Sequence, residues 1–174
     1  MILKENFHIR ELQKSNETID QLSLLLIETV ANGDSVSFMH PLEPTIAREF
    51  WEQSLLAAEK GKRVVLGAYD NENLVGTVTL LLDFPPNQPH RAEIAKMITR
   101  ISHRGRGIAT RLLMEAEKIA HEKDRTLLCL DTAEDGGAAG LYEKLGYNRT
   151  GLIPDFAYKP HGGLTGTIIY WKRL

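Results

Sequence analysis

Apolar residues recur at helical spacing in several stretches of this chain, and each stretch predicts a helix. The first lies between Asn16, which we expect to cap the helix, and Gly33, which we expect to end it. The second runs over residues 43–59 and the third over residues 107–123. The apolar positions of these helices are, in order, Ile19, Leu22, Leu26 and Val30; Ile46, Phe50 and Leu55; and Ile108, Leu112, Ala116, Ile119 and Ala120.

Shorter runs rich in β-branched and aromatic residues alternate with the helices and predict strands. These runs cover residues 7–12, 64–69, 74–82, 92–99, 126–130, 147–152 and 165–171. Residues 70–73 join the second run to the third as a hairpin turn, so that pair is expected to be antiparallel. The strand, helix and strand between residues 92 and 130 predict a parallel crossover.

The rest of the chain contains one short helix and loops. The helix is expected over residues 136–145, where Gly146 stops it, and residues 34–42 and 85–89 are expected to be loops. The sequence contains no repeat and no interdomain linker. We therefore expect a mixed α/β fold in one domain, residues 1–174, with a central twisted mixed β-sheet of about six to seven strands flanked by about four helices.

The composition is typical of an ordinary globular protein, with 43% hydrophobic and 25% charged residues. A net charge of −2 gives no electrostatic reason to expect nucleic acid or an anionic membrane as a partner. The apolar runs are far shorter than the roughly 20 residues of a membrane span, and residues 1–6 lack the basic start of a signal peptide. These features predict a cytoplasmic protein, in which the single Cys129 is a buried, unreactive thiol.

The sequence Arg104-Gly105-Arg106-Gly107-Ile108-Ala109, here called the basic turn, lies between a predicted strand and the third helix. Glycine lets a backbone come close to a ligand, and the N–H groups at the start of a helix favour an anion. The basic turn is therefore a candidate pyrophosphate site, with Arg104 and Arg106 as charge partners. The alternative interpretation is an ordinary loop with solvated arginines.

Two motifs together resemble the GNAT acyl-CoA N-acyltransferase superfamily. The basic turn fits the pattern Arg/Gln-x-x-Gly-x-Gly/Ala, and residues 138–147 fit Ala-x-x-Leu-Tyr-x-x-x-Gly-Phe/Tyr. The order of predicted elements is also similar to that superfamily. Asp135 departs from its pattern, which often has Asn at that position. Short matches at residues 35–39, 91–93, 130–132 and 167–170 further resemble the tabtoxin-resistance acetyltransferases.

The resemblance implies an acetyl-CoA-dependent N-acetyltransferase. It implies that the strand holding Met97, Ile98 and Thr99 splays from its neighbour at a bulge, so that free backbone groups bind the acyl carbonyl and the pantetheine amides. Lys96, which interrupts the apolar run, is compatible with that bulge. Tyr142 occupies the position of the phenol that protonates or stabilises the departing thiolate. The remaining residues expected to bind the cofactor are Arg104, Gly105, Arg106, Gly107, Ile108, Ala109 and Thr110.

Acylation of an amine requires a proton acceptor, because an alkyl amine is mostly protonated at neutral pH. Glu93 lies on the strand that leads to the basic turn, and Asp131 follows an apolar run at the carboxyl end of a strand, where α/β sheets place ligands. The resemblance implies that these carboxylates form the catalytic pair. Alternatively, Glu93 pairs with Arg91 or Lys96, and Asp131 caps a turn with Thr132.

Two segments outside the cofactor motifs, residues 34–41 and 155–166, are expected to wall the acceptor pocket. Loops on a rigid scaffold usually carry specificity. Both segments hold aromatic or apolar side chains, and we predict that Phe38, Met39 and Tyr158 contact the substrate, with Phe156 beside them. The alternative is that these side chains cover the core or form a contact between two copies of the chain.

The expected reaction transfers acetyl from acetyl-CoA to a primary amine of a small molecule, such as an amino-acid-like toxin or antibiotic. No metal is expected, because the 6 histidines and Cys129 have no metal-ligand spacing. The alternative acceptors are a protein N-terminus or a lysine. A non-catalytic acyl-CoA-binding regulator is disfavoured, because binding alone needs none of Glu93, Asp131 and Tyr142. The sequence leaves open whether the protein forms a homodimer.

Overall fold

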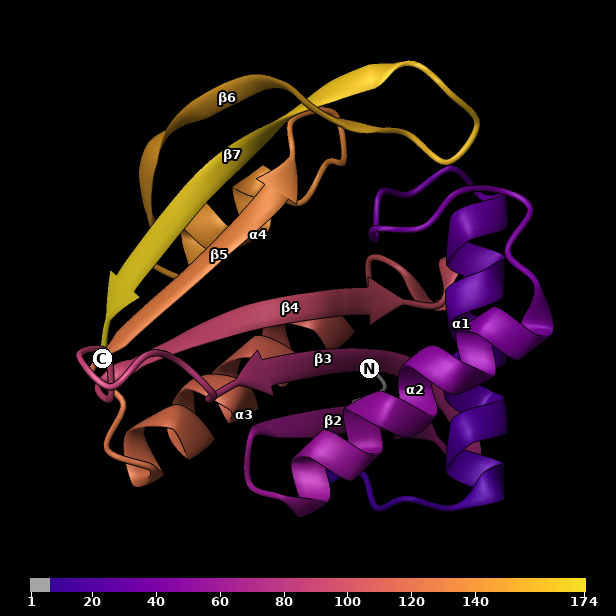
Figure 1. Cartoon of the computed structure of the whole chain (residues 1–174), viewed down its shortest axis with the longest axis horizontal. Coiled ribbons are helices and arrows are strands. Elements are labelled where there is room, and N and C mark those ends of the chain that lie inside the picture. Colours follow the sequence, from indigo (N-terminus) through magenta and orange to yellow (C-terminus); the bar gives the residue numbers. More distant parts are fainter. Residues whose placement is uncertain (1–6) are drawn as a thin grey trace, which may run out of the picture.

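The computed structural model describes residues 7–174, whose strands form a seven-stranded sheet in the order β1-β2-β3-β4-β5-β7-β6 (Figure 1). The β4–β5 pair is parallel, and the other neighbouring pairs are antiparallel. The strands are β1 (His8–Glu11), β2 (Arg63–Asp70), β3 (Asn73–Leu81), β4 (Arg91–Thr99), β5 (Leu127–Ala133), β6 (Asn148–Tyr158) and β7 (Leu164–Arg173). The α-helices are α1 (Asn16–Ala31), α2 (Pro44–Glu59), α3 (Ile108–Glu122) and α4 (Ala139–Lys144). The predicted mixed α/β class is confirmed.

Helices cover both faces of the sheet, α1 and α2 on one and α3 and α4 on the other (Figure 1). The buried apolar residues accordingly form two clusters. The cluster under α1 and α2 includes Trp51, and the cluster under α3 and α4 includes Tyr170; both side chains are 0% exposed. The predicted parallel crossover β4–α3–β5 is confirmed, with Arg91 opposite Leu127.

The three long helices lie where they were predicted, whereas α4 is shorter than the predicted residues 136–145, and two further details of the helices are wrong. Ser15, not Asn16, caps α1, and its hydroxyl accepts a hydrogen bond from the backbone N–H of Thr18 at 3.0 Å. In α2, Ile46 is 50% exposed, so the expected stripe was wrong at that position, whereas Leu55 is buried as predicted. The buried face instead contains the small residues Ala47 and Ser54, which let α2 approach the sheet closely. Its large buried residues are Trp51 and Leu55.

Strand β4 contains the bulge that the resemblance implied. Thr77 of β3 lies opposite Ile98 and Thr79 lies opposite Ala95, so β4 carries one extra residue between them. Lys96 lies within this bulge and has a left-handed backbone, with φ +49°. The described residues of β4 and β5 pair only as far as Glu93 and Cys129, and beyond that point the two strands diverge (Figure 1).

The carboxyl-terminal hairpin differs from its prediction. Strand β6 extends to Tyr158 instead of ending at residue 152. Phe156 and Tyr158, which were expected in a loop, therefore lie in a strand that pairs with β7. All residues of β6 except the half-buried Gly151 are exposed. The strand therefore shows no alternation of buried and exposed positions that a sequence pattern could reveal.

Candidate functional site

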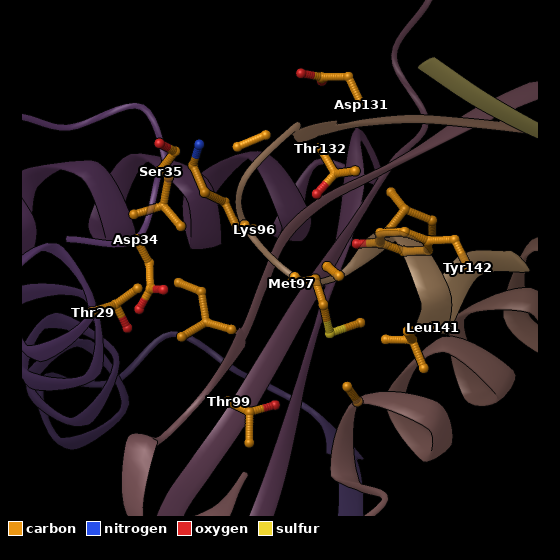
Figure 2. A pocket seen from close by; sticks show the side chains of 18 of the residues that line it. Thr29, Asp34, Ser35, Lys96, Met97, Thr99, Asp131, Thr132, Leu141 and Tyr142 are labelled. Atoms are coloured by element: carbon orange, nitrogen blue, oxygen red, sulfur yellow. The ribbon is translucent and has the colours of Figure 1, made fainter. Parts of the chain in front are cut away.

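A cavity of about 640 Å³ lies where β4 and β5 diverge. Its walls come from β4, the basic turn with the start of α3, the ends of β5 and α4, the β6–β7 hairpin, and residues 34–37. Figure 2 shows Asp34 and Lys96 on one side of this pocket and Asp131 and Tyr142 on the other, with Met97 between them. The fold thus gathers at one place the residues that the sequence predicted for cofactor and catalysis, with the exception of Arg106.

The basic turn has the backbone of an anion cradle. Gly105 and Gly107 both have left-handed φ values, +76° and +80°, and a Cβ added at either would meet no atom within 4 Å. Gly107 caps α3, so the first N–H groups of that helix lie next to this open space. Gly105, Gly107, Ile108, Ala109 and Thr110 all line the cavity. The turn can therefore accept a diphosphate without displacing side chains.

The two arginines of the turn differ in position. Arg104 lines the cavity, and its guanidinium donates to the carboxylate of Asp34 at 2.7 Å and to the carbonyl oxygen of Thr99 at 3.3 Å. Arg106 lies outside the cavity lining. Asp34 was predicted only as part of residues 34–41 at the acceptor pocket, and its contact with the basic turn was not predicted. Its ion pair with Arg104 ties the loop after α1 to the basic turn.

The splayed part of β4 presents its backbone to the cavity. Met97, Ile98 and Thr99 all line it, although the Ile98 side chain is only 2% exposed and packs under α1. Because β5 no longer pairs with β4 at this level, a ligand can hydrogen-bond to this edge as an added strand would.

Glu93 lies on the cavity wall at the last level where β4 and β5 still pair. Its carboxylate accepts a hydrogen bond from Arg91 at 3.1 Å, so the ion pair considered from the sequence does form. Arg91 is itself fixed, since its guanidinium stacks 3.9 Å from the ring centroid of Phe84 and donates to the side chain of Gln88 at 2.9 Å. This arrangement orients the Glu93 carboxylate and leaves it in the cavity.

Asp131 lines the opposite wall and is exposed to the cavity. It does not cap a turn with Thr132; its carboxylate instead accepts a hydrogen bond from the hydroxyl of Thr167 on β7 at 2.8 Å. Glu93 and Asp131 thus lie on the two strands that diverge, and each carboxylate is held by a hydrogen bond, from Arg91 and Thr167 respectively.

Tyr142 lines the cavity from α4 and is only 4% exposed. Its ring packs 5.7 Å from that of Tyr147 and 5.8 Å from that of Tyr170, measured between centroids. Its hydroxyl points into the pocket (Figure 2). Burial, with smaller contributions from Asp131 and Tyr170, raises the pKa of Tyr142 to about 12. The phenol therefore keeps its proton at neutral pH and can donate a hydrogen bond.

Lys96 is the cavity residue that sequence reasoning missed, since the sequence indicated only a bulge there. Its ammonium donates to the hydroxyl of Ser37 at 2.9 Å and lies 5.8 Å and 5.6 Å from the ring centroids of Phe38 and Phe50. Burial lowers the pKa of Lys96, and the nearby Asp131 partly opposes that effect. The signal in the sequence was a lysine inside an apolar strand, at the level of the predicted site.

The residues predicted to bind the acceptor differ in whether they line the cavity. Tyr158 and Phe156 line the cavity. Phe38 and Met39 are outside its lining, because Phe38 packs edge-on against Phe50 and Met39 is 50% exposed. Residues 35–37 of the same segment line the wall instead. The predicted roles of Phe38, Met39 and Tyr158 in substrate binding remain predictions.

The two segments expected to wall the acceptor pocket do meet. The backbone N–H of His40 donates to the carbonyl oxygen of Pro160 at 2.9 Å, and the ring of His161 hydrogen-bonds to the carbonyl oxygen of Ala31 at 2.9 Å. Asp135, the departure from the motif, accepts hydrogen bonds from Thr165 and Lys159, and these bonds lower its pKa. Asp135 therefore holds the β6–β7 hairpin at the mouth of the cavity.

Residues 7–174 contain no cluster of three or more His, Cys, Asp or Glu side chains that could hold a metal ion. None of the helices in that part of the chain is long and apolar enough to cross a membrane. Cys129 is half-buried, not buried as predicted, because it shares with Leu127 the face of β5 that lies outside the core cluster under α1 and α2.

Comparison with known proteins matches the acetyltransferase (GNAT) family over residues 27–147 of this chain. Human N-acetyltransferase 8B is 34% identical over 86 residues, which are 48% of this chain and 38% of that protein. The match thus spans well under half of that relative's length.

Similar solved structures extend over nearly the whole chain. An N-acetyltransferase from Staphylococcus aureus Mu50 is 19% identical with a TM-score of 0.80, covering 97% of this chain and 98% of that one. The Salmonella typhimurium protein YncA, solved with its cofactor acetyl-CoA, is 14% identical with a TM-score of 0.78, covering 97% and 94%. At these identities the likeness establishes a shared fold.

Proposed function

This chain belongs to the acetyltransferase (GNAT) family, and from that membership we propose that it transfers the acetyl group of acetyl-CoA to a primary amine of a small molecule. The observation that carries the proposal is a single cavity that holds an open glycine cradle, Glu93, Asp131 and Tyr142. The basic turn and the first N–H groups of α3 would hold the diphosphate. The free edge of β4 would hold the pantetheine arm. Bound acetyl-CoA supplies a thioester as the acyl donor.

The carboxylates perform the proton transfer in this mechanism. An amine nitrogen becomes nucleophilic only after it loses its proton, and Glu93 can accept that proton directly or through a water molecule. Asp131, on the other side of the cavity, assists by attracting the ammonium form of the acceptor. As the amine nitrogen forms its bond to the acyl carbon, the backbone around Ile98 donates a hydrogen bond to the acyl oxygen.

Tyr142 acts at the other end of the reaction. When the carbon–sulfur bond breaks, the sulfur departs as a thiolate, and a phenol in the pocket can stabilise or protonate it. The raised pKa of Tyr142 supports this role, because the phenol is neutral and ready to donate. Its rigid packing against Tyr147 and Tyr170 keeps the hydroxyl in place.

We further propose an amino-acid-like toxin or antibiotic as the acceptor, in line with the resemblance to the tabtoxin-resistance acetyltransferases. The acceptor end of the cavity is walled by residues 35–37, Phe156 and Tyr158, which enclose a small molecule more readily than a protein surface. The proposal includes residues 1–174 acting as one domain, a cytoplasmic location and a homodimer.

The decisive experiment is a screen of amines with acetyl-CoA, read by release of the CoA thiol. We expect turnover with at least one small primary amine and a loss on the order of a hundredfold in Glu93→Gln. Asp131→Asn should lower turnover less, and CoA affinity measured by calorimetry should stay the same in both variants. Glu115→Gln, on the exposed side of α3, is the matched control. Full turnover in both active-site variants would show that neither carboxylate takes part in the mechanism. No turnover with any amine would favour the alternative of a non-catalytic acyl-CoA-binding regulator.

A further inference from the structure

Lys96 and Ser37 make an unusual contact in the wall of the cavity. Both are non-glycine residues with left-handed backbones, φ +49° and +75°, and they come from segments 59 residues apart. Such conformations are uncommon in non-glycine residues and gather at functional sites. Their hydrogen bond aims the lysine ammonium along the cavity wall, at the acceptor end.

The ammonium of Lys96 is only partly satisfied there. An ammonium has three donors, and the hydrogen bond to the neutral Ser37 hydroxyl uses one of them. Its other contacts are the faces of Phe38 and Phe50. Among residues 7–174, no carboxylate pairs with Lys96 within 4.0 Å, in contrast to most other cations near the cavity, such as Arg91 and Arg104.

A half-buried cation without an anionic partner is costly, and an arriving anion would relieve that cost. The diphosphate of acetyl-CoA would bind at the basic turn, which follows the carboxyl end of β4. The pairing of β4 with β5 lies near the opposite, amino end of that strand. Asp131, which lies near enough to Lys96 to act on its charge, and Glu93 line the same cavity, and their negative charges suit an ammonium. The acceptor end therefore offers carboxylates for an amine and one lysine for an anion.

We propose that Lys96 is a specificity-determining residue that binds a carboxylate on the acceptor, so that the substrate is an amino acid rather than a simple amine. This inference rests on the proposed function. The acceptor amine lies toward Glu93 and Asp131, and its carboxylate replaces water at the Lys96 ammonium. Ser37 keeps the ammonium extended into the cavity, and Phe38 and Phe50 prevent it from folding back into bulk water.

The test compares amino acids with the amines formed by removing their carboxylate: methionine with 3-(methylthio)propylamine, phenylalanine with phenethylamine, and lysine with cadaverine. The same comparison is made for every further acceptor found in the amine screen. We expect wild-type kcat/KM to favour the carboxylate-bearing member at least tenfold. Lys96→Met should remove that preference by raising KM for the acid, with kcat/KM for the decarboxylated amine kept. Lys96→Arg should retain part of the preference.

The controls separate recognition from structure. Lys62→Met makes the same substitution at a lysine that pairs with Asp83 outside the cavity lining, and it should keep the preference. Ser37→Ala should reduce the preference, since the ammonium loses the hydrogen bond that keeps it extended into the cavity. Equal losses for both members of a pair in Lys96→Met would assign the lysine a structural role and overturn the inference. If the acceptors that the enzyme uses carry no carboxylate, the inference about Lys96 is refuted and the proposed acetyltransferase function is not. If no acceptor is turned over, both the inference and the proposed function are refuted.

Discussion

Tyr142 illustrates how the surroundings of one residue set its chemistry. A tyrosine ionises more easily in water than in a buried aromatic cluster, and here burial raises the pKa of Tyr142 to about 12. A group whose pKa is raised stays protonated until the pH approaches that higher value. The hydroxyl is therefore a hydrogen-bond donor over the whole range in which acetyl transfer is measured.

We predict that Tyr142→Phe lowers kcat by about tenfold to a hundredfold, because the departing sulfur loses its donor. The shape of the pH profile between pH 6 and 10 should not change, since Tyr142 does not titrate there. Steady-state rates across that range provide the measurement. Tyr147→Phe, which removes a hydroxyl from the same ring cluster outside the cavity lining, should leave kcat unchanged. Loss of an alkaline limb below pH 10 in Tyr142→Phe would contradict the assignment.

At the residue scale, the sequence predicted site residues that belong to local motifs and missed those that depend on distant contacts. Glu93, Asp131 and Tyr142 were identified by their places relative to strands and to the second motif. Asp34 reaches Arg104 across 70 positions, and Lys96 reaches Ser37 across 59. No local pattern encodes such encounters, because tertiary packing alone brings the two segments together.

At the scale of elements, the basic turn depends on glycine for two separate reasons. Gly107 needs its left-handed φ to begin α3, and the space beside it must stay open for a ligand. Gly61, after α2, has a similar φ of +70° and equally open surroundings, but it lies away from the cavity. The chain therefore supplies its own control for separating backbone strain from loss of binding.

We predict that Gly107→Ala and Gly61→Ala each lower the free energy of unfolding by about 1 kcal/mol, because alanine is strained in the left-handed region. Only Gly107→Ala should also weaken CoA binding, by at least about tenfold or ~1.4 kcal/mol. Urea titration and calorimetry measure the two effects. Equal CoA affinity in the two folded variants would place the diphosphate elsewhere.

The loop after α1 is coupled to the basic turn through Asp34. The Asp34–Arg104 pair is partly exposed, so it contributes less than about 1 kcal/mol to stability. A diphosphate must compete with Asp34 for Arg104 and is repelled by its carboxylate. We predict that Asp34→Asn tightens CoA binding by roughly twofold to tenfold at low salt, and that the gain shrinks at high salt.

The matched control for that prediction is Asp83→Asn, which breaks the exposed pair with Lys62. It should leave CoA affinity unchanged at every salt concentration in the same calorimetric titrations. Weaker binding by Asp34→Asn would mean that Asp34 positions Arg104 for the ligand instead of competing with it.

Elements with a buried face were predicted well, and elements without one were not. Helix α1 and the β2–β3 hairpin follow their patterns because one or both faces lie in the core. In α2, the small residues Ala47 and Ser54 share the buried face with Trp51 and Leu55, so a prediction based on large apolar residues wrongly included Ile46. Strand β6 is almost fully exposed, and its hydrogen bonds to β7 set its length.

At the scale of the whole molecule, the sequence predicted the fold class but not the order of the last strands. Strand β7 enters between β5 and β6, and this leaves β6, the penultimate strand, as an edge. That placement also brings Thr167 to Asp131 and carries Phe156 to the mouth of the cavity. The strand order of the sheet therefore determines which residues lie at the acceptor side of the site.

The exposed edge β6 carries our last prediction. It presents Ile153, 45% exposed, and Phe156, 55% exposed, next to unpaired backbone groups, a surface that proteins usually cover. We expect a second copy of the chain to cover it, giving a homodimer of twice 19.6 kDa in sedimentation equilibrium. Ile153→Lys should shift the protein to the monomer, because a buried charge has no partner there. Leu24→Lys, at a 63% exposed leucine of α1, should remain dimeric. A wild-type protein that sediments as a monomer would refute this role of β6.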